Sequence, residues 1–171
     1  MFSRYSVILI ALFVMTGSGF TKELKIGYIH SQRILSEFQE SIEAQRTLDE
    51  EQREWVDKAK NMEQEIAAME EEYENQSLLV SEEKKAERLK EIQAKYLEYQ
   101  RFQQEIWGET GKLYQRNQEL TKPLIDKVNA VIQKLGEEGD YDIIFDAAVG
   151  NIVYAKDDYD MTDLVLDDLN D

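Results

Sequence analysis

The sequence of 171 residues contains no cysteine, one histidine and one proline. Without thiols the chain cannot form disulfides, thiolate metal sites, cysteine nucleophiles or acylated cysteine anchors. The single histidine, His30, leaves no material for a multi-histidine metal site, and no serine or cysteine partner for a catalytic pair is evident. We therefore expect no catalytic residues, no metal and no cofactor, and a protein that is not an enzyme.

Positive charge is also scarce, with 20 basic residues against 36 acidic ones and a net charge of −16. This balance argues against nucleic-acid binding, which requires a basic surface. Apolar residues make up 42% of the chain, too many for a disordered acidic tail. The acids at 157–160 do not have the spacing of a calcium loop, so we interpret the acidic C-terminal segment as a solvated surface.

Glycine and proline are both absent between Gly27 and Gly108. Apolar residues recur there with the 3.5-residue period of a coiled coil. One run is Trp55, Ala59, Met62, Ile66, Met69 and Tyr73; the other is Leu89, Ile92, Tyr96, Tyr99, Gln103, Ile106, Thr110 and Leu113. We expect two long helices that form an antiparallel hairpin with its tip near 75–81, where Ser81 can cap the second helix. The alternative, one continuous helix in an intermolecular coiled coil, explains neither this cap nor the apolar residues beside it.

The fold class expected is α+β, with a long helical hairpin projecting from a small β-rich oligomerisation body. We assign 20–40 to the body, 41–120 to the arm and 121–171 to the body again. The body should contain strands at 24–29, 141–146 and 152–155, a turn at 150–151, a separate or kinked helix at 124–135 between Pro123 and Gly136, and a C-terminal helix capped by Asp160. So small a core is marginal alone, and association is the usual remedy.

Residues 1–19 differ from the rest of the chain. Arg4 precedes an apolar run at 7–15, and small residues follow as far as Gly19. This pattern predicts a secretory signal peptide that is cleaved near Gly19. An uncleaved anchor is disfavoured because the run is too short to span a bilayer. Loss of Arg4 would leave 36 acidic and 19 basic residues, a net charge of −17.

Two groups of apolar residues are candidates for contact with a guest chain. Aromatic residues in the second helix either complete the core of the arm, which is the usual role of such a stripe, or form an inner wall that binds a client. A hairpin tip has few neighbours, so apolar residues there are harder to explain as core. The candidates are Leu78, Leu79, Val80, Tyr96, Tyr99, Phe102 and Trp107.

Gly108 and Gly111 lie where the pattern predicts a helix. Together with Lys112 they partly match the phosphate-loop motif. We reject a phosphate loop because Ile106 and Leu113 occupy the positions where that motif needs glycine and a serine or threonine. Both glycines remain hinge candidates. Close packing against the partner helix and a flexible root for the arm are equally consistent with them.

The chain resembles the Skp/OmpH family of periplasmic chaperones. The resemblance lies in residues 25–35 (KIGYIHSQRIL), Pro123 with the helix after it, 141–146 (YDIIFD) and 161–166 (MTDLVL), in that order around a long hairpin. It implies a periplasmic homotrimer whose body is built from three chains. The arms of such a trimer enclose unfolded outer-membrane proteins and prevent their aggregation without ATP.

Two departures from the family pattern qualify what the resemblance implies. His30 replaces an acidic residue common in the family, and the chain is strongly acidic where the best-known members are basic. Lipopolysaccharide binding is therefore not carried over, and clients are expected to be basic or held by apolar contacts. The alternative function is a structural coiled-coil spacer or adaptor of the cell envelope, which would need no apolar interior surface.

Overall fold

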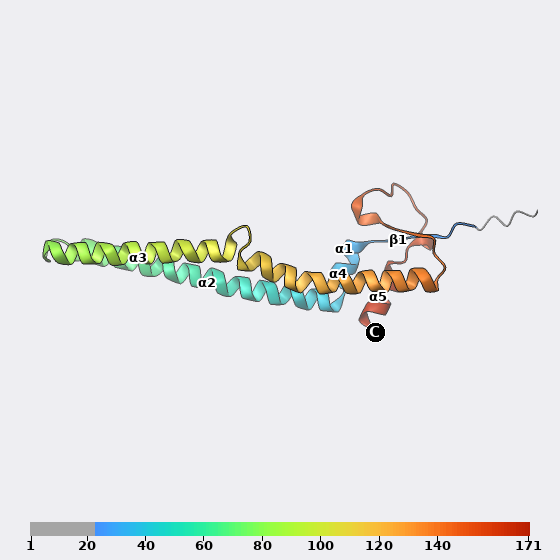
Figure 1. The fold of residues 1–171 in the computed structure, drawn as a ribbon, viewed down its shortest axis with the longest axis horizontal. Coiled ribbons are helices and arrows are strands. Elements are labelled where there is room, and N and C mark those ends of the chain that lie inside the picture. The colour runs from blue at the N-terminus through green and yellow to red at the C-terminus, as the bar shows by residue number, and fades with distance from the viewer. Residues whose placement is uncertain (1–22) are drawn as a thin grey trace, which may run out of the picture.

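The computed structural model describes residues 23–171 as an elongated helical arm joined to a small body (Figure 1). The signal-peptide prediction lies outside the described residues. The elements in chain order are β1 Ile26–Ile29, α1 Ser31–Glu37, α2 Gln39–Gln76, α3 Glu82–Trp107, α4 Lys112–Glu138, β2 Ile143–Asp146, the short 3-10 helices η1 Ala147–Val149 and η2 Asp157–Tyr159, and α5 Thr162–Asn170. We use "arm" for 41–120 and "body" for the other described residues.

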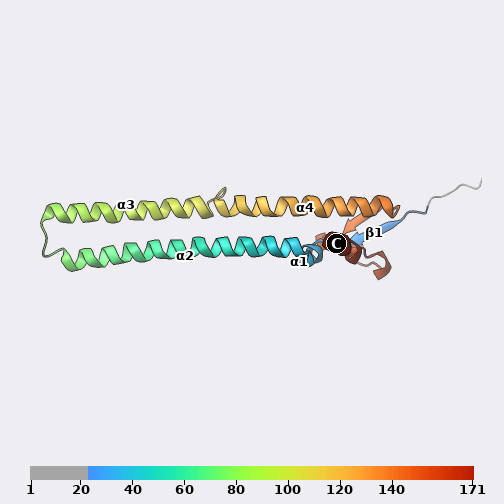
Figure 2. The same ribbon diagram turned by 90° about the horizontal axis from the view of Figure 1, so that it is seen from below.

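The arm is an antiparallel pair in which α2 runs outward and α3, followed by α4, returns to the body (Figure 2). The α2 seam predicted from Trp55 to Tyr73 is the face that is at least partly buried. Helix α2 ends at Gln76 and α3 begins at Glu82. The Ser81 hydroxyl accepts a hydrogen bond from the Lys84 amide at 3.4 Å, as its capping role predicts.

The half of the arm that returns to the body is two helices, α3 and α4, rather than one continuous helix. This corrects the prediction that Gly108 and Gly111 lie within a helix. Residues 108–111, which we call the elbow, separate α3 from α4. On the tip side of the elbow the Lys58 ammonium lies over the Phe102 ring, and on the body side Glu51 pairs with Arg116. Seven residues of α2 therefore face fourteen residues of α3, the elbow and α4, and the seven extra residues lie in and around the elbow.

Helix α4 continues through Pro123 and Gly136, so of the two alternatives the separate helix after Pro123 was wrong, as was the end before Gly136. Proline inside a helix removes one backbone hydrogen bond and costs about 3 kcal/mol. Here the helix is held by its packed face, where Leu124, Val128 and Val131 are buried in the body core. Tertiary packing thus overrides the local preference.

The sheet has two strands, β1 and β2, paired in parallel with Ile26 opposite Ile143 and Ile29 opposite Asp146. The third strand predicted at 152–155 is not formed. Instead β2 leads into η1, and Gly150 makes the predicted turn with φ 77°. Val153 and Tyr154 are 99% and 82% exposed, so the segment has no neighbour within the described chain that would complete a strand.

The core lies in the body, where β1, α1, α4 and α5 converge around Ile34, Phe38 and Val165, all at most 1% exposed. The C-terminal helix is formed, but its N-cap is Met161 rather than the predicted Asp160. The Asp160 carboxylate still accepts a hydrogen bond from the Thr162 amide at 2.9 Å. Among residues 23–171, no helix has the length and apolar character needed to cross a membrane.

Candidate functional site: an uncharged flank of the arm

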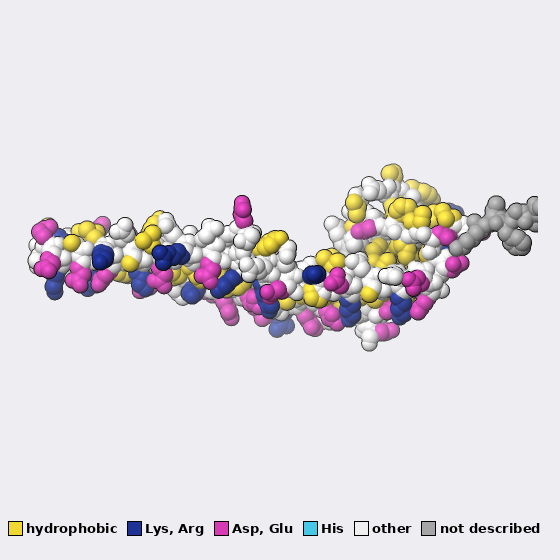
Figure 3. Space-filling view, in the orientation of Figure 1, with side chains coloured by type: hydrophobic (Ala, Val, Ile, Leu, Met, Phe, Trp, Pro, Cys, Tyr) yellow, Lys and Arg dark blue, Asp and Glu magenta, His cyan; other side chains and the backbone are white. Residues whose placement is uncertain are grey.

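One side of α3 carries no charge over six turns. At 3.6 residues per turn, nine exposed residues fall within a sector of about 120°. They are Ala86, Leu89, Gln93, Tyr96, Leu97, Gln100, Gln103, Gln104 and Trp107, and we call them the uncharged flank. Leu89, Tyr96 and Leu97 are each about half exposed, at 48%, 51% and 45%. Figure 3 shows hydrophobic side chains along the arm edge where α3 lies.

The adjoining solvent-exposed side of α3 is densely charged. Lys90 and Arg101 border the flank, and farther round the helix lie Glu87, Glu91, Glu98 and Glu105. The seam between the two sides packs on α2 and includes Tyr99 and Phe102, two of the predicted client-binding residues. Tyr99 donates a hydrogen bond to Glu63 of α2, and that bond, with burial, raises the pKa of Tyr99 above its usual value. These two aromatic rings therefore belong mainly to the interior of the arm.

The structure also corrects the predicted seam of α3. Lys95 and Phe102, rather than Tyr96 and Gln103, turn toward α2. The Lys95 ammonium lies 3.0 Å from the Glu65 carboxylate, and this contact raises the pKa of Lys95. Tyr96 is left on the uncharged flank, available to a guest.

Near the elbow the flank opens into a hollow of about 500 Å³ between α2 and the adjoining ends of α3 and α4. Trp107 and Tyr114 stand at its edge, 37% and 50% exposed, while the buried Ile106 and Leu48 help to line it. Trp107 is held by Phe102, whose ring it meets edge to face with centroids 6.0 Å apart. Its apolar lining and half-exposed aromatic rings are suited to van der Waals contact with a side chain.

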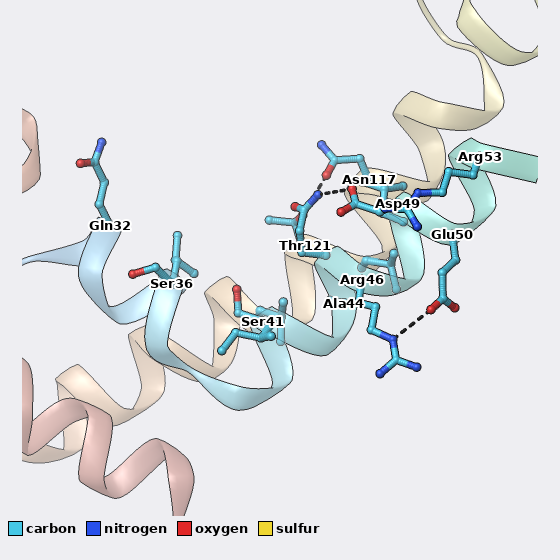
Figure 4. Close-up of a pocket in the computed structure, with 16 residues that line it drawn as sticks. Gln32, Ser36, Ser41, Ala44, Arg46, Asp49, Glu50, Arg53, Asn117 and Thr121 are labelled. Atoms are coloured by element: carbon cyan, nitrogen blue, oxygen red, sulfur yellow. Dashed lines mark hydrogen bonds and ion pairs between the residues drawn. The ribbon is translucent and has the colours of Figure 1, made fainter. Parts of the chain in front are cut away.

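A second hollow, of about 870 Å³, continues from the first toward the body and shares Leu48 and Asn117 with it. Figure 4 shows Asn117 and Thr121 of α4 beside Asp49 of α2, while the ion-paired Arg46 and Glu50 point away from them. The two hollows form one furrow, which we call the root furrow, between α2 and α4.

At the tip, Leu78 and Leu79 are 92% and 84% exposed, and Val80 is partly buried. This apolar tip is separated from the root furrow by the length of α3. Of the predicted client-binding residues, Tyr96 and Trp107 therefore share the uncharged flank, and Leu78 and Leu79 form a separate exposed group.

The arrangement is suited to holding a chain rather than transforming one. Apolar and aromatic side chains alternate with glutamine amides, which can donate and accept hydrogen bonds to any extended backbone. Among residues 23–171, no cluster of three or more histidine, cysteine, aspartate or glutamate residues could hold a metal ion. The apolar side chains and amides of the flank can contact extended chains of many sequences weakly.

Sequence reasoning missed the glutamine residues and Leu97 as members of this surface. A signal was present, because Leu89, Gln93, Tyr96, Gln100 and Trp107 recur at spacings that keep them on one helix face without a single charge. In a chain that is 33% charged, such a long uncharged face is a feature that could have been recognised before the fold was known.

The described residues thus form a small body from which a long antiparallel helical pair projects. The sequence matches the model of the family described as Outer membrane protein (OmpH-like) over residues 25–169, and the chain belongs to that family. No curated protein matches the sequence. Among solved structures, an OmpH-like candidate outer membrane chaperone from Caulobacter crescentus is similar, with a TM-score of 0.77, 14% identity, and coverage of 86% of this chain and 85% of that one.

Proposed function

We propose that this protein is an ATP-independent periplasmic holdase chaperone that binds unfolded outer-membrane proteins along the uncharged flank and the root furrow. The single observation that carries the proposal is the uncharged flank itself. A highly charged helical arm leaves one continuous face of exposed leucine, tyrosine, tryptophan and glutamine open to solvent. Such a face is unfavourable in water unless it serves as a binding surface.

Membership of the OmpH-like family and the likeness to the Caulobacter crescentus protein support a chaperone role. Outer-membrane strands alternate apolar and polar residues. An unfolded segment of this kind therefore finds both apolar partners and amide groups on the flank. Many weak contacts of this type delay aggregation without a sequence code and without nucleotide.

The working form in this proposal is a homotrimer joined through the body. Support comes from a group of exposed apolar side chains on the body, visible in Figure 3. Phe145, Val149, Val153 and Tyr154 are 45%, 67%, 99% and 82% exposed, which is costly for a monomer. Three arms rising from one base would place their flanks around a shared space.

The experiment is suppression of aggregation of a urea-unfolded β-barrel protein, followed by light scattering. A variant with Leu89→Gln, Tyr96→Gln and Leu97→Gln keeps the helix and the charge but removes the apolar groups of the flank. It should require several-fold more protein for the same suppression. The matched control, Lys90→Gln with Glu98→Gln on the charged side, leaves the net charge unchanged and should behave as the parent.

Equal activity of the flank variant and the parent would remove the client surface from α3. If neither protein suppressed aggregation at any ratio, the spacer function would replace the chaperone function. Sedimentation equilibrium of the chain without residues 1–19 tests the assembly separately, and a folded monomer at micromolar concentration would contradict the trimer.

A further inference from the structure

The hollow at the elbow differs from the rest of the flank because it combines two half-exposed aromatic residues with one carboxylate. Trp107 and Tyr114 come from opposite sides of the elbow, and Glu109 between them is the sole charged residue in the lining. Leu48, Ile106 and Leu113 complete the apolar part of the lining.

Glu109 is exposed, and no salt bridge within residues 23–171 involves it. The basic groups near it already have acidic partners. The Lys112 ammonium lies 2.6 Å from Glu105, and the Arg116 guanidinium lies 2.9 Å from Glu51. A cation at the rim of the hollow would therefore meet a carboxylate that has no ion-pair partner among residues 23–171.

The elbow holds Glu109 in place through its backbone. The Gly111 amide donates to the Gly108 carbonyl at 2.9 Å, and the Gln115 side-chain amide donates to the Thr110 carbonyl at 2.8 Å. A side chain at Gly111 would place its Cβ 2.5 Å from the Ile106 carbonyl oxygen, so the turn depends on close backbone contact. The carboxylate thus projects from a defined turn rather than from a free loop.

Aromatic faces attract cations, and arginine stacks on them more readily than lysine because its guanidinium is planar. The arm already contains one such contact, with the Lys58 ammonium 4.8 Å from the Phe102 ring centroid. The net charge of −16 adds a field that draws basic segments toward the arm. Charge and ring chemistry therefore favour the same occupant.

We propose that the elbow hollow is a subsite for an arginine side chain of an unfolded client, with the guanidinium against Trp107 and Tyr114 and paired with Glu109. The inference rests on the proposed function, since the side chain belongs to the client. It gives the arm a local preference for basic client segments, whereas the rest of the uncharged flank contacts clients irrespective of their sequence.

The test uses soluble peptides, which do not aggregate, so its outcome is independent of the holdase assay. The probes are capped glycine–serine peptides that carry three arginines, with matched peptides in which glutamine or phenylalanine replaces them. In the full chain with Trp55→Phe, Trp107 is the remaining tryptophan, and its fluorescence reports binding. The arginine peptide should bind about fivefold more tightly than the glutamine peptide.

Glu109→Gln should weaken arginine-peptide binding about threefold, whereas Glu71→Gln, an exposed site of equal charge on α2, should leave it nearly unchanged. Trp107→Leu should also weaken binding, measured by calorimetry because this variant lacks the reporting tryptophan, and Tyr96→Leu on the same flank should have little effect. Calorimetry with the chain that retains Trp55 measures the same affinities if the Trp55→Phe variant is unstable. Equal effects of Glu109→Gln and Glu71→Gln, or tighter binding of the phenylalanine peptide, would overturn the proposal.

Discussion

The Arg116 Nε lies 2.9 and 3.0 Å from the two carboxylate oxygens of Glu51, joining α4 to α2 on the body side of the elbow. Both side chains are about one-third exposed. The contact belongs to the register of the body half of the arm, which is offset by seven residues from the register of the tip half.

We expect Arg116→Ala to lower the free energy of unfolding only slightly, because a partly exposed ion pair contributes little to stability. Urea denaturation followed by circular dichroism measures the change. A double-mutant cycle with Glu51→Gln isolates the pair, and an interaction energy of zero would mean that the register is set by apolar packing alone.

A second prediction concerns the turn at the elbow. Gly111→Ala should destabilise the arm by more than 1 kcal/mol, because the new Cβ would meet the Ile106 carbonyl. Gly136→Ala is the matched control within α4, where the nearest atom is Ile144 Cδ1 at 3.3 Å. Alanine gains helix propensity there, so stability should hold or rise.

Motion about the elbow, predicted from Gly108 and Gly111, stays a prediction. Spin labels at exposed sites on α3 and α5 would report it as a broad distance distribution. A single narrow distance would contradict the hinge and support a fixed elbow.

Acid should weaken the body through Asp146. Burial alone would raise the pKa of this carboxyl, but hydrogen bonds from Ser31 and from the Ala148 amide outweigh burial and lower it. Because the folded-state pKa is lowered, the stabilisation is present above the ordinary aspartate pKa and is lost as pH falls through the folded-state pKa.

Asp146→Asn should therefore cost about 1 kcal/mol near neutral pH and reduce the loss of stability at acidic pH. Denaturation curves across the acidic range measure this. Asp167→Asn, exposed on α5, is the charge-matched control. Parallel pH profiles for Asp146→Asn and the parent would show that Asp146 does not contribute to acid sensitivity.

Client charge should determine how salt affects capture. With a net charge of −17 after loss of residues 1–19, the protein should repel acidic unfolded barrel proteins and attract basic ones at low ionic strength. Added salt should therefore maintain or strengthen capture of an acidic client and slow association of a basic one. A steep loss of acidic-client binding with salt would point instead to a local basic surface on α3, around Lys84, Lys85, Arg88, Lys90 and Lys95.

The long helices were predictable because the α2 seam is a single unambiguous heptad stripe. In α3 two stripes compete, one through Tyr96 and one through Lys95 and Phe102, and periodicity alone cannot say which faces α2. The lysine packs inward because its ammonium reaches Glu65, a contact that only the folded pair reveals.

Other features depend on tertiary context as well. Pro123 and Gly136 are local signals for helix ends, but the buried face of α4 overrides both. The two glycines, Gly108 and Gly111, were a sequence signal for the break between α3 and α4. The seven extra residues on that side of the arm could not be predicted, because they are defined only by which residues of α2 they face. The elbow hollow joins residues on both sides of that break with Leu48 of α2, and no local pattern connects them.

Site-specific photo-crosslinking tests the central claim most directly. A photoreactive amino acid is placed at Tyr96 or Leu97 on the uncharged flank and, as a matched set, at Glu87 or Glu98 on the charged side. An unfolded barrel protein is then added and irradiated. The account predicts strong crosslinks from Tyr96 and Leu97 and weak ones from Glu87 and Glu98. Equal crosslinking from both sides, or crosslinks confined to the charged side, would contradict a client surface on the uncharged flank.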